Sequence, residues 1–474
     1  MTSRHAKGPF EEAYLEGMPV GLLEAAPAGD GAPGRRRPPT PRDLPSEPIA
    51  LGGQVITPDG VLRGWVRIEA GLVTAITGRK PRDARTVATD GVIMPGMLDL
   101  HGHPEFNVFA AWEPPKTYVN RYSWRGGELY QQLIRAPQNR LLTELPSGTQ
   151  LRYAEIRAVV GGVTAIQGAS LRTQGSQESM VRNVDGVVFG EHRARAAIDL
   201  PSSPTSRGGP ELAKIVTAIA AGEVDAFFVH LAEGMRDNRR SQAEFAHLVS
   251  LDALTPATVI IHGTALSRVD LGQAADAGAS LVWSPQSNLR LYAETTRAAD
   301  ALDVGLPVAL GADWLPSGST SLLTELKVAR QELVNQGHPL TPEELVSMVT
   351  SGAARVAGLS EQLGSIAIGR AADVVVMERR AGDAHESVCD STPADVELVL
   401  IGGDLVYGRE DWVRDLADDP TDSSLESVTA WGRRMLLDTG FAVQPGDGSE
   451  PVPTLAELRN LLISSYPQVG PIWA

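Results

Sequence analysis

The sequence predicts an α/β fold: a closed (β/α)8 TIM-like barrel, irregular in one stretch, beside a small β-sandwich built from the N- and C-terminal flanking strands. Three observations predict it. Short apolar segments alternate with helix-like segments over about 250 residues, which is the pattern of parallel β/α units. The flanks alternate apolar and polar residues between glycine-rich turns, as antiparallel strands do. The length of 474 residues accommodates both parts.

Along the chain these patterns define four parts. Residues 1–48 are dense in Pro, Gly and Arg, which predicts a flexible N-terminal extension. Residues 49–92 and 364–410 carry the strand patterns and are expected to join as one composite sandwich. Residues 93–363 hold the barrel. Residues 411–474 are expected to form a helical extension, because periodic Leu- and Arg-rich segments occur there.

Seven strands are convincing in the barrel region. The first ends in "PGMLDL", and the others lie within residues 161–169, 185–190, 225–234, 257–266, 279–288 and 307–314. Helix-like segments separate them, for example residues 209–224 and 320–337. An eighth strand is only weakly marked, by "RARAAIDL" at residues 193–200, so we expect the barrel to be irregular there.

Composition excludes several classes of partner. The chain has 58 acidic and 42 basic residues and a net charge of −16, which argues against nucleic acid and anionic membranes. No apolar segment approaches the ~20 residues that span a bilayer, and the first residues lack the apolar core of a signal peptide. Cys389 is the only cysteine, so no internal disulfide is possible. These features predict a cytoplasmic protein with a small-molecule substrate.

Two histidines one residue apart, His101 and His103, follow the first apolar segment of the barrel. In an extended strand, residues i and i+2 project on the same side, so this pair is expected to point side by side from a strand end. Two neutral imidazoles held in this way can bind one metal ion. An isolated H-x-H pair would more often be two solvated loop residues, so a metal site is predicted only if further ligands occur elsewhere in the chain.

Other polar residues fall at the ends of other predicted strands, namely His230 and Glu233, His262, and Asp313. Because the carboxyl ends of barrel strands meet at one mouth, these residues and the histidine pair are expected to face a single pocket. Any one of them alone would be an ordinary polar residue at a strand end. Four histidines and an aspartate in equivalent positions favour a metal site.

A long aromatic segment, residues 106–130, is expected to shape the substrate pocket. Its rings could stack on a flat heterocycle, or they could pack beneath the loop or at a subunit interface, and both alternatives stay open. These rings are Trp112, Tyr118, Tyr122, Trp124 and Tyr130, with Arg121 or Arg125 available for an anionic group. Further candidate substrate contacts are Gln167, Arg172, Arg182, Asn183, Asn288 and Trp314.

The segments "PGMLDLHGH", "HLAE", "IHGTAL", "SPQSNLRL" and "LGADW", followed by "GSIAIGRAADVVV", resemble the amidohydrolase superfamily. The similar branch holds cytosine, guanine and adenosyl-type deaminases and the triazine hydrolases, and the resemblance runs from about Ile49 to Gly408. It implies one divalent metal ion per chain, Zn2+ first and Fe2+ or Mn2+ as alternatives, held by His101, His103, His230 and Asp313. A homodimer is compatible with it.

The resemblance also implies roles for the other polar residues. His262 would orient or polarise the attacking water or the substrate, and Glu233 would shuttle a proton. A glutamate three residues beyond a ligand cannot continue along the strand in the same direction, so we expect a turn at Ala232 that carries the carboxylate over the metal. Two-metal members use a carboxylated lysine at a strand end, where none of the five lysines of this chain is placed.

The implied activity is that of a mononuclear metal-dependent hydrolase, a deaminase-like amidohydrolase acting on C–N bonds of a cyclic, heteroaromatic small molecule. Metal-bound hydroxide would attack an electron-poor carbon, Asp313 would accept a proton, and Glu233 would deliver one to the departing ammonia or amine. Two alternatives remain. Hydrolysis of a cyclic amide would release no ammonia, and a non-catalytic relative is disfavoured because the whole ligand set is present.

Overall fold

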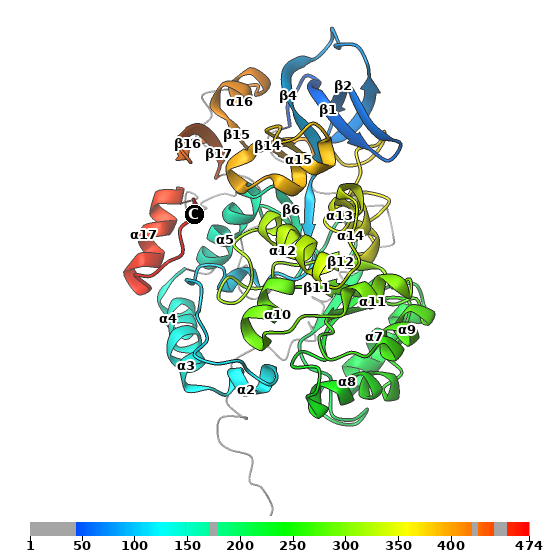
Figure 1. Ribbon diagram of the computed structural model, residues 1–474. Helices are drawn as coiled ribbons and strands as arrows, with labels where there is room; N and C mark the ends of the chain where they lie inside the picture. Colours follow the sequence, from blue (N-terminus) through cyan, green and yellow to red (C-terminus); the bar gives the residue numbers. More distant parts are fainter. Residues whose placement is uncertain (1–43, 147, 170–178, 420–424, 440–452, 474) are drawn as a thin grey trace, which may run out of the picture.

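Eight parallel strands form the barrel of the computed structural model, which describes residues 44–146, 148–169, 179–419, 425–439 and 453–473 (Figure 1). They form two hydrogen-bonded sheets, in the orders β5-β6-β7 and β12-β11-β10-β9-β8. The N–H of Leu100 donates to the carbonyl of Leu310 (3.4 Å) and so joins the ends of β5 and β12. The strands are β5 (Met97–Asp99), β6 (Val163–Ile166), β7 (Arg182–Asn183), β8 (Ala194–Ala197), β9 (Ala226–Leu231), β10 (Thr258–His262), β11 (Ser280–Trp283) and β12 (Val308–Leu310).

The predicted barrel is therefore confirmed, and the weakly marked eighth segment contains β8. The expected irregularity is also present, because the two sheets are separate between β7 and β8. The strand expected at residues 185–190 is wrong. That segment contains turns, with positive φ angles at Phe189 and Gly190 and a single bridge between Val188 and Glu191. Gln167 and the N–H of Gly168 donate to the Asp185 carboxylate, which fixes the start of the turn segment.

Helices connect the barrel strands and cover them. Side-chain caps fix where several begin; the hydroxyl of Ser321, for example, accepts a hydrogen bond from the N–H of Thr324 at the start of α12. The connecting helices are α5 (Thr149–Val160), α7 (Gly209–Ala220), α8 (Arg239–Ser250), α9 (Arg268–Asp276), α10 (Pro285–Tyr292), α11 (Ala298–Asp303), α12 (Leu322–Asn335), α13 (Pro342–Ser347) and α14 (Ser351–Val356). The segment after β5 adds η1 (Pro104–Phe106), α2 (Arg121–Arg125), α3 (Glu128–Tyr130), η2 (Gln131–Arg135) and α4 (Ala136–Glu144).

Strands from both flanks join in one nine-stranded sheet with the order β16-β17-β15-β14-β13-β4-β1-β2-β3 (Figure 1). The two ends of the chain meet where β4 pairs antiparallel with β13. The strands are β1 (Ile49–Thr57), β2 (Gly60–Glu69), β3 (Leu72–Thr77), β4 (Arg85–Pro95), β13 (Val374–Met377), β14 (Val396–Ile401), β15 (Asp404–Arg409), β16 (Leu425–Ala430) and β17 (Arg433–Asp438). The remaining elements are α15 (Ala384–Asp390), η3 (Pro393–Asp395), α16 (Glu410–Leu416) and α17 (Leu455–Ser465).

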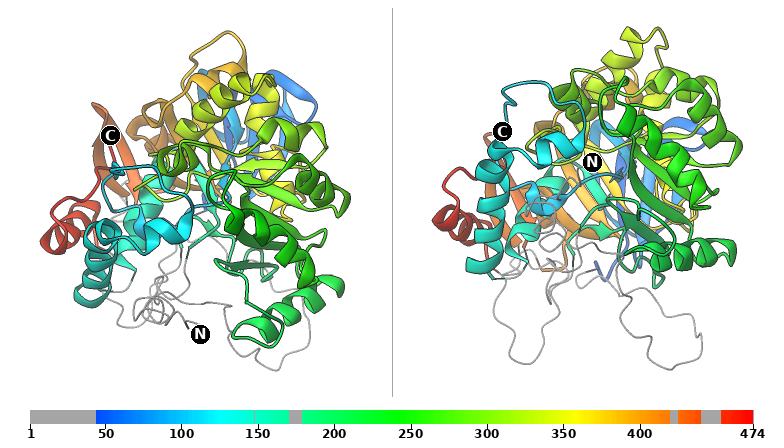
Figure 2. Two further views of the ribbon diagram at one scale, coloured as in Figure 1. Left: turned by 60° about the horizontal axis from the view of Figure 1, so that its bottom comes forward. Right: turned by 90° about the horizontal axis from the view of Figure 1, so that it is seen from below.

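The expectation of a wholly helical segment 411–474 is wrong. Between α16 and α17 lies the hairpin β16–β17, which extends the sheet beyond β15. Trp431 and Gly432 form its two-residue turn, both with positive φ angles (45° and 78°), as the type I′ turns of hairpins require. Helix α17 lies beside α4 and α5, as the two views of Figure 2 also show. Most of the predicted N-terminal extension, residues 1–43, lies outside the described residues.

The chain passes from the flanking sheet into the barrel within two residues, from β4 to β5 through Gly96. A Cβ atom at Gly96 would lie 2.2 Å from the hydroxyl oxygen of Thr164 on β6, so only glycine fits there. The N–H of Gly96 donates to the carbonyl of Asp373 just before β13. The histidine pair thus follows a strand that both parts of the fold hold in place. None of the described helices is long and apolar enough to cross a membrane.

Candidate active site

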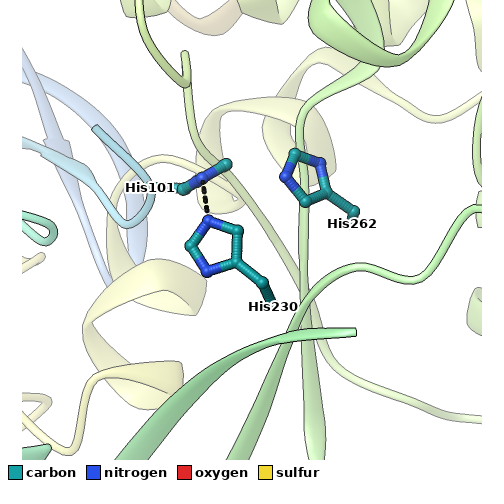
Figure 3. A group of neighbouring side chains, drawn as sticks. All are labelled: His101, His230 and His262. Atoms are coloured by element: carbon teal, nitrogen blue, oxygen red, sulfur yellow. Dashed lines mark hydrogen bonds between the residues drawn. The ribbon is translucent and has the colours of Figure 1, made fainter. Parts of the chain in front are cut away.

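Three imidazoles converge at the carboxyl ends of the barrel strands. The Nε2 atoms of His101, His103 and His230 lie 3.1–3.3 Å from one another. Figure 3 shows His101 and His230 meeting through their ring nitrogens, with His262 of the neighbouring strand β10 close by. The carboxylate Oδ1 of Asp313 lies 3.4 Å from Nε2 of His101 and 4.0 Å from Nε2 of His103. The four side chains that the sequence predicted as ligands therefore enclose one point.

The histidine pair reaches this point by a route that differs from the expected one. Strand β5 ends at Asp99, two residues before His101, and His103 has a left-handed backbone conformation (φ 49°, ψ 53°). The two side chains are therefore not parallel neighbours on an extended strand. They meet because the chain turns at His103, and their binding of one shared metal ion stays a prediction.

Asp313 is held against His101 by the backbone. Its N–H donates to the carbonyl of His101 (2.7 Å), and its own φ angle is 58°. A Cβ atom at Gly311, two residues earlier, would lie 2.4 Å from Cβ of His101, so glycine is required for this close approach. The carboxylate also accepts the N–H of Trp314 (2.8 Å), which fixes its orientation toward the histidines.

The donor set fits a metal ion such as zinc. Two nitrogens bound to one tetrahedral zinc ion at about 2.0–2.1 Å lie about 3.3 Å apart, close to the separations of the three Nε2 atoms. Burial lowers the pKa of His103 to about 4 and holds the pKa values of His101 and His230 well below the usual value, so the rings are neutral and their lone pairs are available. His101 Nδ1 pairs with the Ser284 hydroxyl (2.8 Å), which leaves Nε2 to face the other ligands.

His262 is oriented by hydrogen bonds on the side away from the ligands. Its Nδ1 lies 3.0 Å from Oδ1 of Asn288 on α10, and the Asn288 amide nitrogen donates to the hydroxyl of Thr296 (3.2 Å). The Thr296 hydroxyl donates to the carbonyl of His262 (2.6 Å), which closes the ring of bonds. Because the Asn288 oxygen is an acceptor, Nδ1 of His262 carries a hydrogen, and Nε2 is the ring nitrogen left to face Glu233 and the pocket.

Glu233 is brought over the histidines by the turn predicted at Ala232, whose φ angle is 53°. The carboxylate of Glu244 on α8 accepts the N–H of Ala232 (2.7 Å) and so stabilises the turn. Glu233 is 3% exposed, and its Oε2 lies 3.6 Å from Nε2 of His262. The phenol of Tyr292 donates to Oε1 of Glu233 (2.5 Å). This arrangement places a buried carboxylate beside the ligands without making it one of them.

Aromatic side chains also line the pocket. Trp124 stacks on Trp314 with ring centroids 5.4 Å apart, and Phe106 meets the edge of Trp314 at 5.7 Å. Trp112 and Tyr118 instead pack beneath this layer, as one of the two alternatives for the aromatic segment expected, and stacking of the other rings on a heterocycle stays a prediction. The pocket is lined by His103, Phe106, Arg121, Trp124, Arg125, Tyr130, Ile198, His230, Glu233, His262, Asp313 and Trp314.

Three of the predicted substrate contacts do not line the pocket. Arg182 forms a bidentate ion pair with Asp373 (2.9 and 2.7 Å), so its guanidinium joins the barrel to the flanking sheet instead of facing the pocket. Gln167 donates to Asp185 and does not line the pocket, and neither does its neighbour in the barrel, Asn183. The sequence indicated these residues as ligand contacts because they are polar and lie near strand ends. It could not show their structural partners, such as Asp373, which lies 191 residues from Arg182.

The other predicted substrate contacts have different positions relative to the pocket. Trp314 lines the pocket as expected. Asn288 acts through His262, as described above. Arg172 lies outside the described residues. Arg121 and Arg125 line the pocket but pair with Asp199, and Arg121 also pairs with Glu244 (3.0 Å).

Tyr292 and Ser284 are functional candidates that sequence analysis missed. Tyr292 follows Asn288 by four residues on α10, so both lie on one helix face, and they contact Glu233 and His262 respectively. The i, i+4 spacing within "SNLRLY" is the signal that could have indicated Tyr292, once α10 was placed at the mouth. Nothing in the sequence pairs Ser284 with His101, because 183 residues separate them.

Known proteins share this fold and this sequence pattern. The chain is 27% identical over 408 residues to the 5-methylthioadenosine/S-adenosylhomocysteine deaminase of Desulforudis audaxviator, covering 76% of this chain and 91% of that protein. It is 24% identical over 421 residues to the 5'-deoxyadenosine deaminase of Methanothermobacter thermautotrophicus, covering 78% and 97%. A mutant of the atrazine chlorohydrolase of Arthrobacter aurescens TC1, complexed with zinc and atraton, has the same fold, with a TM-score of 0.60, 18% identity, and coverage of 76% and 95%. Residues 153–406, more than half of the chain, match the model of the amidohydrolase family, and the chain therefore belongs to that family.

Proposed function

We propose that the protein is a mononuclear metal-dependent hydrolase that releases ammonia or an amine from a ring carbon of a heteroaromatic small molecule. The observation that carries this proposal is the group of three converging imidazoles and Asp313 beside a buried carboxylate, Glu233, that is not itself a ligand. The names of the similar deaminases support this class of reaction, since they act on adenosine derivatives.

Zinc is the metal that we propose. Three imidazole nitrogens and one carboxylate oxygen are donors that zinc prefers, and a structure of similar fold contains zinc. Within the part of the chain that the structure describes, no lysine lines the pocket, and Lys214 pairs with Glu211 on the exposed face of α7. A lysine-bridged second metal therefore has no support. When bound, the ion supplies a water molecule of lowered pKa and a positive charge that polarises the target.

Asp313 and His262 handle the proton and the substrate on one side of the pocket. Asp313 would be both a ligand of the metal and the acceptor of a proton from the attacking water, since its carboxylate lies beside the histidines. In its neutral form His262 presents the lone pair of Nε2 to the pocket, because its Nδ1 hydrogen is engaged by Asn288. It can therefore orient a water molecule or a substrate N–H by accepting a hydrogen bond.

Glu233 and the aromatic side chains of the pocket act on the ring. The indoles of Trp124 and Trp314, which line the pocket, offer a surface on which a flat heterocycle would stack. Glu233 then lies within the same pocket and can take a proton and deliver it to a ring nitrogen or to the departing amine. The buried position of Glu233 excludes bulk water from this transfer.

The test is ammonia release from a panel of aminated purines, pyrimidines, pterins and triazines by the zinc-loaded protein. The Glu233→Gln variant should keep its zinc and lose turnover by about 10³-fold, because it removes the proton-transfer group and keeps the shape. The matched control is Glu223→Gln, an exposed residue in the turn between α7 and β9, which should behave as the wild type.

Three results would contradict the proposal. Absence of zinc binding would refute the metal site, and unchanged turnover in Glu233→Gln would refute the role of this carboxylate. Hydrolysis of cyclic amides without ammonia release would instead favour lactam ring opening. The cytoplasmic location and the homodimer stay predictions from the sequence.

A further inference from the structure

A chain of two hydrogen bonds leads from Trp124 to Glu233. The indole N–H of Trp124 donates to the phenol oxygen of Tyr292 (2.8 Å), and that phenol lies 2.5 Å from Oε1 of Glu233. All three side chains are buried, with exposed fractions of 8%, 0% and 3%. They come from three separate segments of the chain, namely α2, α10 and the turn after β9.

The direction of this hydrogen-bond chain is fixed by chemistry. An indole nitrogen is a donor only, so the oxygen of Tyr292 accepts from Trp124. The phenol has one hydrogen, and the acceptor beside it is Oε1 of Glu233. Oε1 is therefore committed as an acceptor, and a proton on Glu233 has to reside on the other oxygen, Oε2.

Oε2 is the oxygen that faces the reaction. It lies 3.6 Å from Nε2 of His262, and both Glu233 and His262 line the pocket beside the metal ligands. Asn288, on the same face of α10 as Tyr292, holds His262 from behind in the same way. Helix α10 thus binds Oε1 of Glu233 through Tyr292 and Nδ1 of His262 through Asn288. The remaining atoms, Oε2 of Glu233 and Nε2 of His262, face each other beside the pocket.

We infer that Tyr292 is a positioning residue of the proposed hydrolase: it holds Glu233 so that Oε2 alone takes up and delivers the proton. The inference rests on the proposed function of Glu233. Tyr292 does not line the pocket, so its effect passes through Glu233. Trp124 has two effects, because its ring lines the pocket and stacks on Trp314 while its N–H orients Tyr292.

The variants Tyr292→Phe and Trp124→Phe separate these effects. In Tyr292→Phe the ring still fills its site but Glu233 can rotate, so kcat should fall by about 10- to 100-fold while KM stays within about threefold. In Trp124→Phe, Tyr292 keeps its hydrogen but loses the donor that directs it, so kcat should fall by about three- to tenfold and KM should rise. Zinc content and the thermal unfolding midpoint are measured for each, because a merely structural defect would change those.

The control is Tyr407→Phe, which removes a buried phenol hydroxyl from β15 in the flanking sheet and should leave kcat and KM unchanged. A wild type that releases no ammonia refutes the proposed function, and the inference falls with it. An active wild type together with full kcat in Tyr292→Phe refutes the inference alone. If Tyr292→Phe loses zinc or unfolds, Trp124→Phe decides: a rise in KM without any loss of kcat overturns the inference.

Discussion

The barrel mouth and the flanking sheet both contain non-glycine residues with positive φ angles, but in different surroundings. At the mouth, His103, Ala232, His262 and Asp313 have φ angles of 49–69° and belong to the candidate active site. In the sheet, Ala70 and Trp431 have φ angles of 51° and 45° at the tips of hairpins. Each such conformation costs about 1–2 kcal/mol.

This difference shows that the left-handed backbone conformation has a different role in each region. At a hairpin tip the turn needs the left-handed conformation, and a glycine would serve equally well. At the mouth the same conformation directs a chosen side chain toward the metal ligands, so a glycine at three of the four positions would remove the functional group. The backbone strain at the mouth is therefore retained for chemistry.

The largest expected effect on activity comes from removing two of the proposed metal ligands. The double variant His101→Ala, His103→Ala should lose its zinc, from about one ion per chain to almost none, and its turnover should fall by about 10³-fold or more, because the activated water is lost. The flanking sheet should stay folded. Elemental analysis and activity measure this, with His338→Ala, a half-buried histidine remote from the pocket, as the control. Zinc retained in the double variant would contradict the assigned ligands.

A large effect on stability alone is expected at the junction of the two regions. Arg182→Met leaves the Asp373 carboxylate, which is 3% exposed, without its bidentate partner, so the free energy of unfolding should fall by about 3 kcal/mol. kcat should stay within about twofold, since Arg182 does not line the pocket. Chemical denaturation and kinetics measure both, with the exposed Arg79→Met as the control. Unchanged stability with lost activity would instead restore Arg182 as a substrate contact.

A pH-dependent effect is expected from Glu325 on α12, whose side chain is fully buried beneath the mouth. Burial raises the pKa of Glu325 from 4.5 to about 8. The folded state therefore holds this proton more tightly than the unfolded state, and its contribution to stability is lost as the pH rises from about 4.5 through 8. In Glu325→Gln, the free energy of unfolding should therefore fall less steeply with rising pH, by up to about 1.4 kcal/mol per pH unit less than in the wild type.

Denaturation of the zinc-free protein between pH 5 and pH 8 measures this difference in slope. The control is Glu361→Gln, an exposed carboxylate whose loss should leave the slope as in the wild type. An equal slope in Glu325→Gln would mean that Glu325 is ionised in the folded protein, against the expectation from its burial.

The smallest effects compare strain in the two regions directly. Ala70→Gly should raise the free energy of unfolding by about 0.5–1 kcal/mol without changing kcat, because glycine adopts a φ angle of 51° freely. Ala232→Gly should relieve similar strain but lower kcat several-fold, because the turn between His230 and Glu233 becomes mobile. Thermal unfolding and kinetics of both variants test the comparison. Equal kinetics in the two variants would show that the rigidity of the turn is unimportant.

The predicted metal ligands could be identified from the sequence because each lies at or shortly after the end of an apolar strand segment, and barrel topology brings such positions together. The turn at Ala232 followed from the three-residue spacing alone. The role of Tyr292 could not be predicted, because its contacts with Trp124 and Glu233 span 168 and 59 residues. The same reason explains Arg182, whose partner Asp373 lies 191 residues away.

The hairpin β16–β17 shows a second reason why the sequence did not predict the whole fold. Strand β17 (RRMLLD) consists largely of good helix formers, and that composition favoured a helix. The alternating burial along β16 and the two-residue turn at Trp431 and Gly432 are the signals that distinguish the hairpin. Pairing with β15 then overrides the local preference.

The composite sheet has a consequence for how the protein is made on the ribosome. Strand β4 ends at Pro95, and its partner β13 begins only at Val374, about 280 residues later. At roughly 5–20 residues per second, the nascent chain carries an open edge of β4 on the order of 15–60 seconds before β13 emerges. The barrel is synthesised during that interval, and the unpaired edge of β4 is open to wrong pairing throughout it, so protection of this edge by a chaperone should matter until β13 emerges.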